Sequence, residues 1–95
     1  MYSRSSPIGL IAVDLLGDAV GRIEATFPYD GSDPEFAVVR LFDAGLSSHL
    51  VPVRGCIRYD DTLQFPFTFY EIRDSPSLQD YRWEYEQGDK ARSYW

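Results

Sequence analysis

Residues 36–42, Phe-Ala-Val-Val-Arg-Leu-Phe, carry the strongest strand signal of the chain. The segment is rich in β-branched and aromatic residues, which favour an extended backbone. Turn signals flank it on both sides, Asp30-Gly31-Ser32-Asp33-Pro34 before it and Asp43-Ala44-Gly45 after it. The sequence therefore predicts a short β-strand here, closed off at both ends by turns.

Weaker strand signals precede this segment. Residues 8–13 are a short apolar run that ends at a turn over residues 16–18. From Val20 the chain alternates, with Ile23, Ala25 and Phe27 on one face and polar residues on the other. This period of two is typical of a half-buried strand.

More strand signals follow it. Residues 50–53 contain Pro52, which suits an edge or a bulge because proline donates no ladder hydrogen bond. Residues 56–59 and 63–67 flank a turn at residues 60–62 and predict a hairpin. Short strands about 8–12 residues apart, without helices between them, predict a mainly β fold. We expect a small antiparallel barrel, which would also remove open sheet edges.

The pattern changes after residue 67. Thr68 and Glu71 have the spacing of a capping box, which predicts a helical turn to Arg73 or Asp74 that Pro76 stops. Leu78, Tyr81 and Tyr85 then form the stripe of a second short helix. Gly88 is expected to end that helix, and residues 91–95 show no clear pattern.

Composition and charge limit the class of protein. The chain has 95 residues, 44% of them hydrophobic, which is typical of one globular domain. Its net charge of −6 argues against direct binding to nucleic acid. One cysteine excludes an internal disulfide and a cysteine-based zinc site. We expect no membrane span and no secretory signal, and a cytoplasmic location.

Four segments together resemble the PRC-barrel family: residues 12–23, 35–41, 50–53 and 65–76. The first is similar to the family's opening hairpin, with Asp before a glycine turn and Val-Gly plus a basic residue after it. The last is similar to the Pro-Tyr-Thr/Ser segment that leads through Ile to Asp-Ala-Pro. Phe69, Tyr70 and Ser75 depart from the usual residues of that segment.

The resemblance implies a docking module without catalytic activity. PRC-barrels occur in the photosynthetic reaction-centre H subunit, in a ribosome maturation factor and as stand-alone bacterial proteins, which this chain most resembles. The implied organisation is a flexible lead at residues 1–7, a PRC-barrel-like domain at residues 8–76 and a helical, aromatic extension at residues 77–95.

No residue is predicted to be catalytic, to bind a cofactor or to bind a metal. His49, the only histidine, is expected to be a loop residue. Cys56 lies between Arg54 and Arg58 on one strand face, which would favour a thiolate, although a small buried residue is the simpler interpretation. The aspartates at residues 30–33 and 60–61 are explained as turn residues, because their spacing does not fit a calcium loop or an acid–base pair.

Aromatic residues are the most informative side chains. Phe65, Phe67 and Phe69 alternate and could line one face of the barrel as core. The C-terminal aromatic residues are too many for one small core, so they predict a protein-interaction surface. The alternative is a tail that packs back on its own barrel. The candidate interaction residues are Phe69, Tyr70, Tyr81, Trp83, Tyr85, Tyr94 and Trp95.

Three functional classes remain. The first is a non-enzymatic adaptor that dimerises or docks on another protein; residues 59–95, with eight acidic and four basic side chains, would suit a basic protein surface. The second is a ribosome-associated or RNA-processing factor that acts through a ribosomal protein. The third is a redox or small-molecule module built on Cys56.

Overall fold

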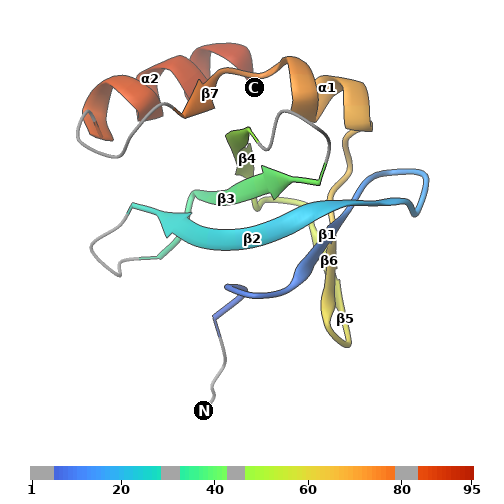
Figure 1. Cartoon of the computed structure of the whole chain (residues 1–95). Helices are drawn as coiled ribbons and strands as arrows, with labels where there is room; N and C mark the ends of the chain where they lie inside the picture. The colour runs from blue at the N-terminus through green and yellow to red at the C-terminus, as the bar shows by residue number, and fades with distance from the viewer. Residues whose placement is uncertain (1–5, 29–32, 43–46, 79–83) are drawn as a thin grey trace.

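The computed structural model describes residues 6–28, 33–42, 47–78 and 84–95. They form one mixed sheet with two helices, α1 (Phe69–Asp74) and α2 (Glu84–Tyr94), on the side of β3 and β4 (Figure 1). The sheet has seven strands. In spatial order these are β5 (Ile57–Tyr59), β6 (Thr62–Gln64), β1 (Ile11–Val13), β2 (Ala19–Phe27), β3 (Phe36–Leu41), β4 (Ser48–Pro52) and β7 (Ser77–Leu78).

The predicted mainly β class is confirmed, but two features of the predicted barrel are wrong. First, β1 pairs with β6 in parallel, so the sheet is mixed and not antiparallel throughout. Second, β5 and β7 form the two ends of the sheet and do not pair with each other within the described residues, so the strands do not close into a barrel. Instead, α1 and α2 both pack against β4 and cover that end of the sheet. Strand signals in a sequence carry no information on strand direction, which is why the parallel pair was missed.

A bulge in β2 separates two packed clusters. The pairing of β2 with β3 shifts register between Ile23, which faces Val39, and Ala25, which faces Val38. Val39 and Ile23 belong to the larger cluster, whereas Val38 belongs to the smaller one. Successive strand residues point to opposite faces, so β3 is buried on both. The buried members of the larger cluster are Leu10, Ala12, Val20, Ile23, Ala37, Val39, Leu41, Val51, Leu63, Phe65 and Ile72.

Helix α2 provides the cover for the second face. Ala91 of α2 is buried against Phe27, Phe36, Val38 and Leu50. Gly88 is buried inside α2, where a Cβ atom would lie 3.0 Å from Cζ of Phe27. The prediction that Gly88 ends a helix is therefore wrong, because this glycine lets the helix approach the ring closely.

The segment between the two helices also differs from the prediction. Leu78 lies in β7, which pairs with Ser48 and His49 of β4, and not in a helix. The predicted helical stripe is therefore wrong at Leu78, its first member. Its second member, Tyr81, lies outside the described residues. Pro52 is the last residue of β4, and β7 reaches only the other end of that strand. The edge-like position predicted for Pro52 is thus confirmed.

Gly21 marks the closest approach between β2 and β3. A Cβ atom at this position would collide with the backbone carbonyl oxygen of Arg40 and lie 3.0 Å from a methyl carbon of Val39. A backbone carbonyl in a paired strand cannot move aside as a flexible side chain can, so only glycine fits.

We expect Gly21→Ala to lower the free energy of unfolding by about 3 kcal/mol, through overpacking at this backbone contact. Gly9→Ala is the control, because its Cβ would meet nothing within 4 Å and would only strain a φ of +96°. That strain costs about 1 kcal/mol. Urea unfolding followed by circular dichroism measures both, and equal losses would contradict the close approach at Gly21.

Candidate functional site

The structure distributes the predicted interaction residues over two places. Phe69 and Tyr70 begin α1, while Tyr94 ends α2 and Trp95 follows it. Tyr81 and Trp83 lie outside the described residues. Tyr85 lies in α2, and its side chain is not described. That these residues contact a partner stays a prediction. The structure does show that some of them are engaged within the chain and that others are exposed.

Trp95 is largely engaged within its own chain. Its indole Nε1 donates a hydrogen bond of 2.8 Å to the carbonyl oxygen of Leu50. Its ring lies 4.4 Å from the ring of Phe67, centroid to centroid, and packs against both clusters. For this residue the structure shows the alternative of a tail that packs back on its own sheet. An indole with one satisfied donor and two apolar contacts is a structural anchor.

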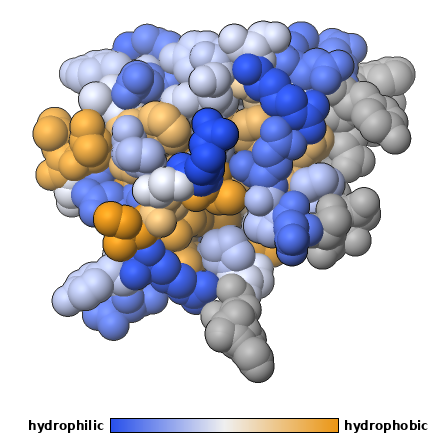
Figure 2. All heavy atoms as spheres, turned by 180° about the vertical axis from the view of Figure 1, so that it is seen from behind, coloured by the Kyte–Doolittle hydropathy of each residue, from blue (hydrophilic) through white to orange (hydrophobic). Residues whose placement is uncertain are grey.

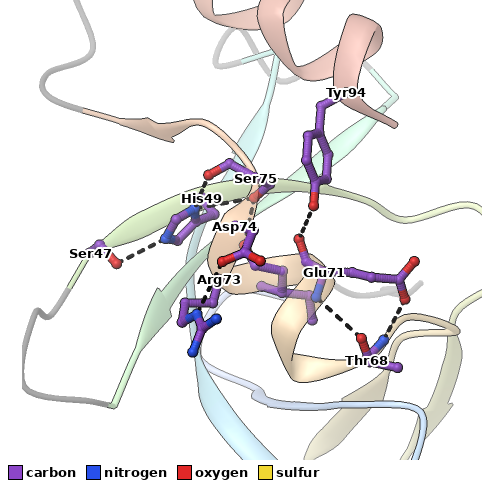
Figure 3. A network of polar contacts seen from close by, with 9 residues as sticks. Ser47, His49, Thr68, Glu71, Arg73, Asp74, Ser75 and Tyr94 are labelled. Atoms are coloured by element: carbon purple, nitrogen blue, oxygen red, sulfur yellow. Dashed lines mark hydrogen bonds and ion pairs between the residues drawn. The ribbon is translucent and has the colours of Figure 1, made fainter.

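Tyr94 connects the two helices. Its hydroxyl donates a hydrogen bond of 2.8 Å to the carbonyl oxygen of Glu71 in α1 (Figure 3). The backbone N–H of Trp95 in turn bonds to the carbonyl oxygen of Ala91. The end of α2 is therefore fixed to α1, and part of the Tyr94 ring remains exposed.

The capping box predicted for α1 is confirmed. The backbone N–H of Glu71 bonds to Oγ1 of Thr68 at 3.2 Å, and the Glu71 carboxylate accepts from the N–H of Thr68 at 2.8 Å (Figure 3). Ile72 buries the inner face of the helix in the larger cluster. These contacts fix the direction of α1, so Tyr70 points outward and is 64% exposed.

Tyr70 and Phe69 form a small aromatic surface at the start of α1. Their rings meet edge to face, with centroids 5.6 Å apart. The guanidinium of Arg73 lies 4.9 Å from the centroid of Tyr70 and pairs with the carboxylate of Asp74 at 3.1 Å. One side of this surface thus carries a cation whose charge is balanced by its neighbour.

A groove lies between α1 and the turn that connects β1 with β2. Its volume is about 700 Å³. We call it the α1 groove; its lining residues are Asp14, Leu16, Asp18, Ala19, Val20, Phe42, Thr68, Phe69 and Tyr70. Large apolar side chains from the β1–β2 turn, the end of β3 and α1 converge on it. It brings Phe69 and Tyr70 together with exposed apolar residues from other segments, Leu16 and Phe42.

Asp14 holds the opposite wall of the α1 groove in place. Its Oδ1 accepts hydrogen bonds from the backbone N–H groups of Leu16 at 3.0 Å and Asp18 at 2.9 Å. Gly17 completes the turn with a φ of +92°, a conformation that favours glycine. This turn leaves Leu16 78% exposed.

Sequence reasoning missed Leu16 and Phe42, which it assigned only to a turn and to a strand. The one available signal was an apolar pair, Leu15-Leu16, directly before a turn glycine. Exposure alone would not have been enough, because hydrophobic residues on the face seen in Figure 2 form separate patches interrupted by hydrophilic ones. Convergence on one groove is what distinguishes these residues.

A second pocket of about 490 Å³ lies where α2 meets the start of β3 and the end of β4. Arg92 of α2 bridges to Glu35 through two contacts of 2.8 Å, from Nε and from Nη2 to the two carboxylate oxygens. The hydrogen bond from Arg92 holds the pKa of Glu35 below its ordinary value. Trp95 also lines this pocket. The pocket is therefore part of how α2 is attached to the sheet.

His49 is buried in β4, so the prediction of a loop residue is wrong. Its Nε2 lies 2.8 Å from the hydroxyl of Ser47, and its Nδ1 lies 3.0 Å from the carbonyl oxygen of Ser75 (Figure 3). Ser47 and Ser48 directly before His49 gave this part of the sequence the polar composition of a loop, although β4 begins at Ser48. A hydroxyl next to an imidazole is one part of a hydrolytic site, but neither of the two pockets above is lined by Ser47 or His49. The contacts connect β4 to the end of α1.

Cys56 lies in a different environment from the one that would stabilise a thiolate. Burial raises the pKa of its thiol to about 12. The Sγ lies 3.5 Å from the carbonyl oxygen of Pro52, to which it donates. The flanking arginines do not offset this desolvation, so the simpler interpretation of a small, partly buried residue is the better one.

We expect Cys56 to react slowly with 5,5′-dithiobis(2-nitrobenzoate) at neutral pH, because a thiol with a raised pKa is protonated there. The rate should increase as the pH rises, and it should approach that of a free cysteine in urea. A rate in the folded protein at pH 7 that equals the rate in urea would contradict the burial of this thiol.

No cluster of three or more His, Cys, Asp or Glu residues in the described ranges is placed to hold a metal ion. No helix in those ranges is long and apolar enough to cross a membrane. No protein-family model matches the chain, and a comparison with curated proteins gave no match.

Proposed function

We propose that this chain is a non-enzymatic protein-binding module that holds its partner in the α1 groove. The observation that carries the proposal is the convergence of Leu16, Phe42, Phe69 and Tyr70 on one depression. Leu16, Phe42 and Tyr70 are all more than half exposed. Large apolar side chains cost free energy when they remain in water, and their clustering marks an interaction site.

Both walls of the α1 groove are rigid, which favours binding. The capping box fixes α1, and the hydrogen bonds of Asp14 fix the β1–β2 turn. A partner therefore meets backbone segments that are already ordered, and less conformational entropy is lost on binding. An exposed tyrosine such as Tyr70 on such a surface is a frequent source of binding energy.

The resemblance of residues 8–76 to PRC-barrel domains supports the same proposal, because those domains look like docking modules. The departures from the family pattern at Phe69 and Tyr70 coincide with the α1 groove. Within this proposal, the sequence has specialised a docking fold at the position where its aromatic residues are unusual.

The charge of the α1 groove favours a different protein over a second copy. A symmetric dimer whose two-fold axis passes through this groove would place Asp14 and Asp18 of each copy near those of the other. Like charges at a partly desolvated interface are unfavourable. The partner in this proposal is therefore another protein, and homodimerisation is the competing outcome.

The test compares two double variants in affinity capture from native lysate, with and without ribonuclease. Leu16→Ser with Tyr70→Ser removes exposed apolar groups from the α1 groove. Ile57→Ser with Tyr59→Ser is the matched control on β5, because those side chains are similarly exposed, at 63% and 73%. We expect one protein to be captured by the wild type and the control, and its recovery to fall at least tenfold with the groove variant.

Three results would contradict the proposal. Capture that both variants retain would exclude the α1 groove as the binding surface. Capture that ribonuclease abolishes would favour the ribosome-associated alternative. Light scattering that shows a dimer in the wild type and a monomer in the groove variant would make the second copy the occupant. Circular dichroism of both variants confirms that each remains folded.

A further inference from the structure

This inference rests on the proposed function and names the kind of segment that the α1 groove accepts. We infer that the groove binds a basic, amphipathic segment of a partner protein, with a lysine or arginine side chain beside Asp14 and Asp18. The apolar residues of the same segment lie against Leu16, Phe42 and Phe69. Both parts of the inference follow from what lines the groove.

Asp14 is the first evidence for a basic side chain in the ligand. The residue is only 3% exposed, although it lines the groove. Its Oδ1 accepts two backbone hydrogen bonds, but within the described residues its Oδ2 accepts none. A buried carboxylate oxygen without a donor is costly. A donor that enters the groove from a partner would remove that cost.

Asp18 adds a second negative charge on the same wall. Its backbone N–H bonds to Asp14, but its carboxylate has no partner within the described ranges. No Lys, Arg or His is among the residues that line the groove. Arg73 lies beside the aromatic wall, but it is paired with Asp74. Among the described residues that line the groove, the charged side chains are therefore all negative, which favours a positively charged ligand.

The apolar residues that line the groove suit the aliphatic part of a lysine or arginine side chain. Lysine and arginine lay their aliphatic stems along apolar surface while the charged end reaches a polar group. The aromatic ring of Phe42, which lines the groove, offers additional attraction to a cation, whereas the guanidinium of Arg73 already lies 5.7 Å from the centroid of the Phe69 ring. A purely apolar segment would desolvate Asp18 and would offer no donor to Asp14, and an acidic segment would be repelled.

The charge of the whole protein supports the same partner. The net charge is −6, with −4 in residues 59–95, which include α1 and α2. This field attracts a basic segment from a distance and accelerates its association. Specific recognition then depends on the local carboxylates, so removing one of them should matter more than changing the total charge.

The test is fluorescence anisotropy with three labelled peptides and the full chain. In one peptide lysines alternate with leucines; in the second every lysine is replaced by glutamate, and in the third by serine. We expect the lysine peptide to bind at least tenfold more tightly than the serine peptide, and the glutamate peptide to bind least. Added salt should weaken the lysine peptide selectively, because it screens charge.

Two variants of equal net charge separate a local effect from a general one. Asp18→Asn removes a carboxylate from the α1 groove, whereas Asp61→Asn removes one at the β5–β6 turn. We expect Asp18→Asn to weaken the lysine peptide about fivefold, and Asp61→Asn to change it little. Asp14→Asn, which keeps an oxygen for the two backbone bonds, should act as Asp18→Asn does.

The outcomes distinguish this inference from the proposed function. Equal binding of the lysine and serine peptides would overturn the basic specificity but leave a groove that binds apolar segments. Equal effects of Asp18→Asn and Asp61→Asn would show general attraction to an acidic protein and overturn the site. Binding of no peptide, with lysate capture still lost in the groove variant, would overturn the inference and retain the proposed function. If no peptide binds and the groove variant captures the same protein from lysate as the wild type, both the inference and the proposed function are overturned.

Discussion

The pairing of β2 with β3 through a bulge determines which side chains reach each face of the sheet. Before the bulge, Ile23 faces Val39 in the larger cluster; after it, Ala25 faces Val38 in the smaller one. Because β3 is then buried on both faces, a second layer must cover it, and α2 provides that layer. The close contacts at Gly21 and Gly88 follow from the same constraint, since both bring backbone against an already filled face. The C-terminal segment is thus part of the fold and not an appendage to it.

This arrangement also determines what is left for a partner. Trp95, Tyr94 and Arg92 are engaged in attaching α2 to the sheet and to α1. Tyr70 at the start of α1 has no such task, because the capping box and Ile72 already hold the helix, whereas its neighbour Phe69 also packs against the larger cluster. Phe69 and Tyr70 lie next to the β1–β2 turn, whose conformation Asp14 fixes with two hydrogen bonds. The α1 groove is therefore a surface whose shape the fold maintains without using its exposed side chains.

The sequence predicted local structure well and long-range structure less well. Alternation, turn residues and a capping box are encoded by neighbouring residues, so β2, β3, the β5–β6 hairpin and α1 were all predictable. The parallel pairing of β1 with β6 and the open sheet were not, because they depend on contacts between distant segments. Gly88 was misassigned for the same reason: its role depends on Phe27, far away in the sequence. Of the site, Phe69 and Tyr70 were predicted from aromatic crowding, whereas Leu16 and Phe42 became visible only when the fold placed them beside α1.

The most direct test of the account is a two-dimensional ¹H–¹⁵N correlation spectrum of the full chain, titrated with the lysine–leucine peptide. The account predicts that the largest shift changes fall on the backbone amides of Leu16, Asp18, Phe42, Phe69 and Tyr70, and that the central strand β3 hardly changes. Shift changes centred on β5, on α2, or spread evenly over acidic surface residues would contradict it.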